Sequence, residues 1–340
     1  MRSALEALYR FISEWDFTNV NSAVFLRAEH HPELLKLLPN DSHLEQTFYP
    51  ATRSLRSDRE LIIENQLHSE IDLSLVLGTK NKSENLCNFA RAYTFTKTDG
   101  NILFSLENQL GGDGFFKQLK KIIPEIQSEG LRRSRVVHLK KSDRLTESTL
   151  KEWLELEWTT VKEQPELIAH CSSFSATKVD PGSTLLLDSL PEPLSGRGAD
   201  FGAGYGFLSY ELLKKSTTIE AIYLIDTELY SLNAAKKNLQ SFTNRVELNY
   251  LWHDLSETPQ ISNLDWIISN PPFHDTIKQQ PELLNRFFDS ALASLKIGGR
   301  FYFVAPTHLK ISNRLPSKFG NYQRLAQHGM YEVVQVEKQR

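Results

Sequence analysis

The sequence predicts an α/β fold built on a mostly parallel, doubly wound sheet. From about residue 180, short apolar runs alternate with segments of helical spacing, which is the pattern of strands joined by crossover helices. Polar residues or glycines follow several of these runs directly, as expected where parallel strands end at the ligand-binding edge of a sheet. Pro271 and Pro272 must end one strand, because neither has a backbone N–H for the ladder.

Length and composition limit the class of protein. The 340 residues suffice for two domains, and the hydrophobic (40%) and charged (24%) fractions are those of a globular chain. No apolar run approaches the roughly 18 residues of a membrane span, and the N-terminus lacks the apolar core of a signal peptide. Cys87 and Cys171 are far apart and not in a metal-ligand spacing, so we expect a cytoplasmic protein without disulfides or metal. A net charge of −3 argues against nonspecific coating of nucleic acid but allows a local basic face.

The first half has a less regular α/β pattern. Residues 2–15 carry apolar side chains at helical spacing and predict an amphipathic helix. Residues 107–112 lead from a strand to a helix over Phe115–Ile126, but without the glycine spacing of a nucleotide-binding turn. Thr149–Glu152 fits a capping box that opens a helix, within a connection spanning about residues 145–170. The apolar or β-branched runs of this half are Ser22–Leu26, Ile71–Leu77, Ala92–Phe95 and Ile102–Leu106.

A basic stretch ends the first half. Leu131–Lys141 holds five permanent cations within eleven residues. Such a stretch is either a solvated edge strand or a patch that contacts phosphates, and the letters alone leave both interpretations open. The five cations are Arg132, Arg133, Arg135, Lys140 and Lys141.

The second half reads as five strands with intervening helices and a terminal hairpin around Gly329. The first of these strands is unusually polar, since Arg197 and Gly198 precede its apolar residues. The predicted strands are Gly198–Phe201, Ala221–Ile225, Val246–Leu251, Leu264–Ile268 and Gly299–Val304. The predicted helices are Ser183–Leu190, Phe207–Lys215, Tyr230–Leu239 and Pro281–Leu295, and the hairpin joins Asn321–Ala326 to Tyr331–Val336.

Three acidic residues and a glycine turn favour an adenosine-type ligand. Gly202–Gly206 follows the first strand, and its glycines permit a sharp turn and close approach of a ligand. Its third glycine comes one residue too early for the dinucleotide pattern. Asp226 ends the second strand, where a carboxylate can accept two ribose hydroxyls, and Asp254 follows the third, where it can accept from an adenine amino group. Asp226 or Asp254 taken alone is also consistent with a helix N-cap. Together with Asp200 and the glycine turn, the two acids indicate a nucleoside pocket.

The run Asn270-Pro271-Pro272-Phe273 is the candidate reaction centre. Two prolines restrict the backbone, so that the Asn270 side chain and the Pro271 carbonyl are held in one orientation. Such a site suits a planar, polar group, although an Asn-Pro-Pro run can also be only a stiff loop. His274 follows, and we expect it to contact solvent.

These motifs together resemble the class I S-adenosylmethionine-dependent methyltransferases. The resemblance implies a Rossmann-like, seven-stranded sheet whose extra antiparallel strand is the terminal hairpin. It also implies that Asp200, Gly202, Gly204 and Gly206 hold the methionine part of S-adenosylmethionine, Asp226 the ribose and Asp254 the adenine. Asn270 borders both cofactor and substrate, and the implied catalytic residues are Asn270, Pro271, Pro272 and Phe273.

A narrower resemblance is to the bacterial small-subunit (RsmC-like) ribosomal RNA guanine-N2 methyltransferases. It rests on Ile267–Asp275, Phe319-Gly320, Leu325–Gly329, Phe174 and Gly182–Leu187. It implies a catalytic domain over 170–340 and a degenerate, methyltransferase-like α/β domain over 1–145 that positions RNA. The expected partner is ribosomal RNA or the small ribosomal subunit, bound by a monomer without membrane or metal.

The chemistry agrees with a guanine amine but does not require it. Such an amine is a poor nucleophile, and the Asn270 amide oxygen and Pro271 carbonyl can accept its two N–H bonds while Phe273 stacks on the base. The same loop serves large-subunit guanine-N2, adenine-N6 and protein glutamine-N5 methylation. The polar first strand leaves open an RNA-binding assembly factor without catalysis, and the glycine spacing disfavours a nicotinamide dehydrogenase.

Overall fold

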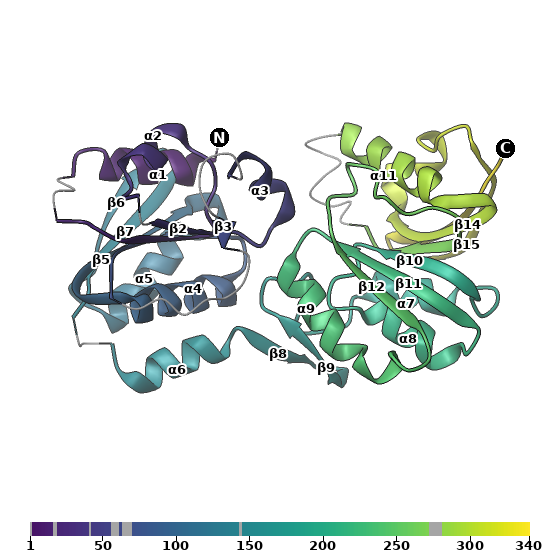
Figure 1. Ribbon diagram of the computed structural model, residues 1–340, viewed down its shortest axis with the longest axis horizontal. Helices are drawn as coiled ribbons and strands as arrows, with labels where there is room; N and C mark the ends of the chain where they lie inside the picture. Colours follow the sequence, from purple (N-terminus) through teal and green to yellow (C-terminus); the bar gives the residue numbers. More distant parts are fainter. Residues whose placement is uncertain are drawn as a thin grey trace. The chain divides into compact units, whose positions relative to one another are not determined.

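The chain forms two compact units, Met1–Trp158 and Thr159–Arg340, each with its own seven-stranded sheet (Figure 1). The computed structural model describes residues 2–15, 19–40, 42–55, 61–62, 70–142, 145–271 and 281–340. A separate two-stranded sheet pairs β8 (Trp158–Val161) with β9 (Gln164–His170). Within the described ranges, none of the helices combines the length and apolar character that crossing a membrane requires.

The first unit has the strand order β3-β2-β1-β4-β5-β7-β6, in which β7 alone runs antiparallel to its neighbours. One face packs under α1 and α2, and the other under α4, α5 and α6. The strands are β1 (Ala23–Leu26), β2 (Ser42–Glu45), β3 (Leu61–Ile62), β4 (Ile71–Leu77), β5 (Thr96–Glu107), β6 (Gln127–Leu131) and β7 (Ser134–Lys140). The helices are α1 (Ser3–Ile12), α2 (Pro32–Leu37), α3 (Tyr49–Leu55), α4 (Lys82–Phe95), α5 (Gly112–Ile122) and α6 (Glu147–Glu155), with a 3₁₀ turn η1 (Asn108–Leu110).

The second unit repeats this topology with the order β12-β11-β10-β13-β14-β16-β15. Figure 1 shows α11 on one face of the sheet and α7, α8 and α9 on the other. The strands are β10 (Gly196–Phe201), β11 (Ile219–Asp226), β12 (Glu247–Trp252), β13 (Leu264–Ser269), β14 (Leu295–Pro306), β15 (Phe319–His328) and β16 (Tyr331–Lys338). The helices are α7 (Pro181–Asp188), α8 (Phe207–Lys215), α9 (Leu229–Asn238) and α11 (Pro281–Ser294), with 3₁₀ turns η2 (Gln240–Phe242), η3 (Thr307–Leu309) and η4 (Ile311–Asn313).

The strand order reverses direction at β10, which lies between β11 and β13. In a doubly wound sheet, the carboxyl ends of the strands at such a switch point border the ligand crevice. The fold predicted for the second half is therefore confirmed, and the switch point lies where the glycine turn and the Asn-Pro-Pro run were expected.

One local prediction in the first unit is wrong, and one apolar run is helical. The run Ala92–Phe95 is the last turn of α4, and three of its four residues are buried; a short apolar run does not distinguish a buried helix from a strand. The helix at residue 150 is capped by Thr146 rather than by Thr149. The Thr149 amide donates to the Thr146 Oγ1 at 3.3 Å, so Thr149 lies in the first turn.

The polarity of β10 has a packing explanation. The strand begins at Gly196, two residues earlier than predicted, and the Trp266 indole of β13 lies directly against Gly198. A Cβ on Gly198 would lie 2.1 Å from that ring, so only glycine fits. The indole Nε1 donates to the Ser195 carbonyl at 3.0 Å. Trp266 therefore supplies the apolar bulk that β10 lacks.

The basic stretch is partly charge-compensated. It forms the β6–β7 hairpin, in which β7 lies inside the sheet and only β6 is an edge strand. Arg135 pairs with Asp113 at 2.6 Å, Lys140 pairs with Asp99 at 3.2 Å, and the Lys141 ammonium donates to the Thr96 carbonyl. Arg132 and Arg133 remain exposed in the hairpin turn. These contacts favour the interpretation as solvated surface over that of a phosphate patch.

Candidate active site

The turn Gly202–Gly206 connects β10 to α8. Gly202, Gly204 and Gly206 have φ angles of +74°, +56° and +84°, in the left-handed region that favours glycine. A Cβ on Gly202 or Gly204 would meet no atom within 4 Å, whereas one on Gly206 would lie 3.0 Å from Ala235 of α9. The first two glycines thus border open space that a ligand can approach, and the third allows close packing of helices.

Asp226, at the end of β11, faces this turn. Its Oδ2 accepts from the Gly204 amide and its Oδ1 from the Glu228 amide, both at 2.8 Å. Burial raises the pKa of Asp226 to about 6, although part of the residue still reaches solvent. A carboxylate has about four acceptor positions, so Asp226 retains acceptor capacity for hydroxyl groups.

Asp200 lies beneath the turn and is fully buried. Its Oδ2 accepts from the Ser209 hydroxyl of α8 at 2.8 Å, and its Oδ1 has no donor among the residues that the structure describes. Burial, with a smaller contribution from the negative charge of Asp226, raises the pKa of Asp200 to about 7. A cation bound nearby would offset the cost of ionising this carboxyl group.

Asp254 follows β12 at the same edge. Its Oδ1 accepts from the Ser256 amide at 2.8 Å, and it is half-buried. The preceding residue, His253, donates its amide to the Asp226 carbonyl at 3.1 Å, which ties the end of β12 to the end of β11. The structure therefore brings the segments of the two acids together.

Asn270 follows β13, and its side chain has a defined orientation. Its Nδ2 donates to Asp180 Oδ1 at 2.7 Å and to Ser183 Oγ at 2.8 Å. A carboxylate only accepts hydrogen bonds, so the end of the amide that faces Asp180 must be the NH₂ group. The amide oxygen of Asn270 is consequently turned away from α7.

Asp180 and Ser183 were not identified from the sequence as partners of Asn270. Asp180 is the N-cap of α7, and its Oδ1 also accepts from the Ser183 amide at 3.0 Å. The Asp-Pro-Gly-Ser run carried a signal for this cap, since Asp precedes a proline at the first helical position. Nothing local indicated the contact with Asn270, which lies 90 residues away.

The strand register brings the predicted site together. Phe201 pairs with Ile225 on one side and with Ser269 on the other. Gly202, Asp226 and Asn270 are therefore the next residues of three adjacent strands, with about 10 Å between the outer two at a strand spacing of about 4.8 Å. Pro271 follows and is buried, while Pro272, Phe273 and His274 lie outside the described residues.

The equivalent edge of the first unit has different chemistry. Leu26 pairs with Glu45 and with Val76, so the next residues are Arg27, Gln46 and Leu77. Arg27 takes the left-handed position, with φ +56°, and its guanidinium donates to Glu84 at 2.6 Å and to Thr47 at 3.0 Å. A second guanidinium, of Arg91, is bound by Glu45 at 2.6 Å. In the first unit, side chains therefore occupy the space beyond the strand ends that the glycine turn leaves open in the second unit.

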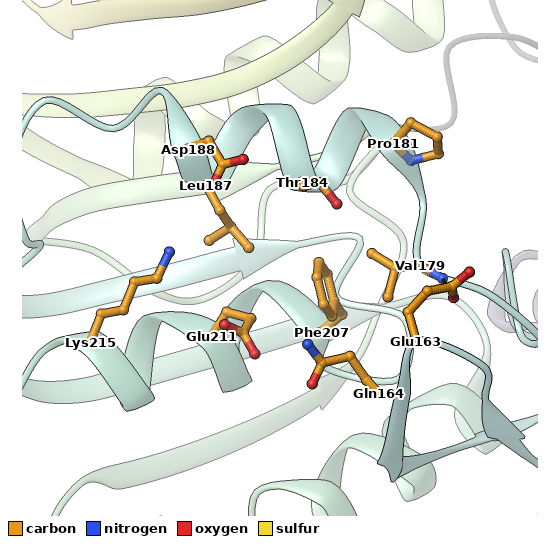
Figure 2. Close-up of a pocket in the computed structure, with 10 residues that line it drawn as sticks. All are labelled: Glu163, Gln164, Val179, Pro181, Thr184, Leu187, Asp188, Phe207, Glu211 and Lys215. Carbon is orange, nitrogen blue, oxygen red and sulfur yellow. Dashed lines mark hydrogen bonds between the residues drawn. The ribbon is translucent and has the colours of Figure 1, made fainter.

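A pocket of about 520 Å³ lies elsewhere in the second unit, between α7, α8 and the β8–β9 turn (Figure 2). In Figure 2, Leu187 of α7 and Phe207 of α8 lie on opposite sides of this space, with Glu163 of the β8–β9 turn and Gln164 of β9 at one end. None of the predicted cofactor or catalytic residues is among those that line it. The candidate site at the strand edge is therefore separate from this pocket.

Comparison with known proteins concerns the second unit as a whole. Residues 164–335, about half of the chain, match the family model of the methyltransferase small domain. The chain belongs to the methyltransferase small domain family. The matched range contains all of the site residues described above, and so the glycine turn, the strand-end acids and Asn270 are features of a methyltransferase small domain in this chain.

Similar proteins extend the comparison beyond that domain. A protein of Shewanella pealeana named ribosomal RNA small subunit methyltransferase C is 29% identical over 72% of this chain and 71% of its own length. Its namesake from Sodalis glossinidius is 28% identical over 86% of this chain and 82% of its own. A solved structure, the T. thermophilus 16S rRNA N2 G1207 methyltransferase (RsmC) with AdoMet and guanosine, superimposes with a TM-score of 0.79 at 23% identity, covering 99% of this chain and 92% of that one. At that identity, the match establishes the two-unit fold.

Proposed function

We propose that this protein transfers a methyl group from S-adenosylmethionine to the exocyclic N2 amine of a guanine in small-subunit ribosomal RNA. The observation that carries the proposal is the Asn270 amide, whose NH₂ end is bound by Asp180 and Ser183 beside the glycine turn. The names of the relatives support the RNA, and the AdoMet and guanosine of the T. thermophilus structure support the cofactor and the base.

The residues at the strand edge fit the cofactor. The open space beside Gly202 and Gly204 is a cradle that any Cβ would narrow, and it adjoins the acceptor positions of Asp226. We assign the ribose hydroxyls to Asp226, the adenine amino group to Asp254 and the methionine part to the turn with Asp200 below it. When bound there, S-adenosylmethionine supplies an activated methyl group on a positively charged sulfur.

The protein's own part in the reaction is to orient the amine. The lone pair of the guanine N2 is delocalised into the ring, so the nitrogen must pyramidalise before it attacks a methyl group. The Asn270 Oδ1 and the Pro271 carbonyl are assigned to accept its two N–H bonds, which favours that geometry. Since Asp180 and Ser183 hold the amide in advance, little reorganisation accompanies the transition state. The stacking of Phe273 on the base stays a prediction.

Variants at Asn270 test this assignment. Loss of one preorganised acceptor typically lowers the rate ~10²–10³-fold, so Asn270→Ala should reduce turnover by that factor while the cofactor Kd changes little. Asn270→Asp keeps an acceptor but loses the donor to Asp180 and places a second carboxylate beside that one, so it should also lose most of the activity. The measurement is N2-methylguanosine formed on small subunits or their RNA, with binding of labelled cofactor in parallel. Near-normal turnover of the alanine variant would reduce the Asn-Pro-Pro run to a structural loop.

Nucleoside mass spectrometry of ribosomal RNA from a deletion strain tests the substrate. We expect one N2-methylguanosine to disappear from the small-subunit RNA and to return with the wild-type gene. Loss from large-subunit RNA, or loss of methylated glutamine detected by parallel peptide mass spectrometry, would instead support the substrates that the same loop also serves. Unchanged RNA and protein methylation, with a defect in subunit assembly, would support a non-catalytic assembly factor.

We further propose that the N-terminal domain, which we expected over residues 1–145, binds no cofactor; its positioning of RNA stays a prediction. The support is chemical: Arg27, Gln46 and Leu77 stand at the positions of Gly202, Asp226 and Asn270, and the Arg27 guanidinium is bound to Glu84. Equilibrium dialysis should give one S-adenosylmethionine per chain. A stoichiometry of two would contradict this proposal without affecting the assignment of the catalytic site.

A further inference from the structure

The charge of the second unit is unevenly distributed. Between Asp289 and Glu332 the sequence holds no acidic residue but six permanent cations, in a chain whose net charge is −3. Three of the six are compensated by carboxylates from outside this stretch: Lys296 by Asp265, Arg300 by Glu192 and Glu337, and Arg324 by Glu332. The other three are exposed and have no ion-pair partner among the described residues; they are Lys310, Arg314 and Lys318.

These three cations are on one ordered segment, residues 307–318, which joins β14 to β15. Its apolar residues anchor it: Ile311 is fully buried, and Leu309 and Leu315 pack against the core under α11. The Thr307 amide donates to the Met330 carbonyl at 2.9 Å, and the Arg314 amide donates to the Ile311 carbonyl at 2.8 Å. Cations thus alternate with anchors, and their backbone is held in place before any partner binds. We call this segment the 307–318 stripe.

The strand register locates one end of the stripe beside the active site. Phe303 of β14 pairs with Ser269 of β13, and β14 continues for three more residues to Pro306. At about 3.3 Å per residue, β14 rises roughly 10 Å above the level of Ser269, on the side of Asn270 away from the glycine turn. The stripe begins directly after this end of β14. A substrate held at Asn270 would therefore lie between the cofactor residues and the first cation, Lys310.

The other end of the stripe lies at the opposite edge of the sheet. β16 runs antiparallel to β14, and β15 runs antiparallel to β16, so β15 starts where β14 starts. The stripe must therefore cross the height of the sheet between Pro306 and Phe319. The stripe therefore leads from the active-site edge along the side of the unit to the opposite edge. Its cations are spaced four residues apart, at Lys310, Arg314 and Lys318.

We propose that the 307–318 stripe binds the phosphate backbone of the RNA strand that flanks the target guanine. This inference rests on the proposed function for the nature of the partner. A row of uncompensated cations on a fixed backbone suits a polyanion with regularly spaced charges, and phosphate contacts position a strand without reading its sequence. The β6–β7 hairpin of the first unit is less suited, since Arg135 and Lys140 are already paired there.

The test uses the full-length chain with Lys310, Arg314 and Lys318 all changed to Gln. Binding to a fragment of small-subunit ribosomal RNA is measured by fluorescence anisotropy at several KCl concentrations. Each lost phosphate contact should reduce the magnitude of the slope of log K against log salt by about 0.7–0.9, so the loss of three contacts should reduce it by about 2–3. The KM for RNA should rise, while the cofactor Kd and the unfolding midpoint should stay unchanged.

A matched control changes Lys214, Lys215 and Lys236 to Gln, in the last turns of α8 and α9. It removes the same charge from the same unit, and crossover helices end at the sheet edge opposite the active site.

If both triple variants lose the same slope, or if the stripe variant loses none, the stripe does not bind RNA. Unchanged RNA binding with lost binding to an acidic protein would also overturn the proposal. If the wild-type protein binds RNA through the stripe but methylates no RNA, the proposed function is rejected and the proposal for the stripe stands.

Discussion

Replacing Asp180 by Ala should impair catalysis through Asn270, although Asp180 itself is assigned no contact with substrate or cofactor. The carboxylate accepts from Asn270 Nδ2 at 2.7 Å and caps α7 through the Ser183 amide. A hydrogen bond to a charged group contributes about 1.5–3 kcal/mol. If that energy holds the amide in its productive orientation, its loss corresponds to a fall in turnover of roughly 10- to 150-fold. The fall should not exceed that of Asn270→Ala.

The variant also loses a helix cap, which costs about 0.5–2 kcal/mol of stability. Thr146→Ala is the matched control, because Thr146 caps α6 in the first unit by the same type of contact and is remote from Asn270 in sequence. We expect similar losses of stability from the two variants and a loss of turnover only from Asp180→Ala. Asp180→Asn retains an oxygen acceptor and a good capping residue, so it should restore most of the rate.

A double-mutant cycle decides whether Asp180 acts through Asn270. Single-turnover methylation and cofactor affinity are measured for both single variants and for the double variant. Residues that act as one unit are non-additive, so Asp180→Ala should cost almost nothing further in the Asn270→Ala background. A full additional loss in that background, or a large change in cofactor Kd from Asp180→Ala alone, would refute the reasoning.

Three further predictions concern the cofactor residues and the sheet. Asp226→Ala should weaken S-adenosylmethionine binding by about 1.5–3 kcal/mol for each ribose hydrogen bond lost, and calorimetry showing unchanged affinity in a folded variant would exclude that role. Gly198→Ala should destabilise the second unit by about 1–3 kcal/mol in urea unfolding because its Cβ meets Trp266, and a smaller residue at 266 should recover part of the loss. The pKa of Asp200 is raised to about 7, so the folded state holds a proton that the unfolded state releases near pH 4; without cofactor, stability should therefore fall as pH rises from 4 to 7. Asp200→Asn should flatten that fall, and equal pH dependence in both proteins would contradict it.

The sequence predicted those parts of the candidate site that depend on a single strand and on the residues that directly follow it. A buried parallel strand followed by glycine, acid or Asn-Pro-Pro has few alternatives, because each signal is local and the sheet aligns the strand ends. Gly202, Asp226 and Asn270 were found in this way, and the register places them side by side.

The parts that were not predicted depend on residues far apart in the chain. Asp180 meets Asn270 across 90 residues, and Arg135 meets Asp113 across 22. The polar β10 seemed anomalous only because its partner Trp266 is on another strand. Similarly, residues 107–112 showed only that the first half lacks the glycine spacing of a nucleotide-binding turn, and no local pattern indicated that Arg27 binds Glu84, 57 residues away. Whether a side chain is buried or its charge is compensated depends on a second residue that can be far away in the chain. A local sequence pattern contains only one of the two residues.

The strand order has a consequence for synthesis on the ribosome. All strands of the first sheet lie within the first 140 residues, so that unit can complete its sheet while later residues are still being added. In the second unit, β16 is made after β15 but lies between β15 and β14. Until residues 331–338 have left the exit tunnel, β15 has no strand to pair with and β14 lacks one neighbour. The nascent second unit thus exposes unpaired strand edges up to its last step, which is the stage at which a holdase chaperone would protect it.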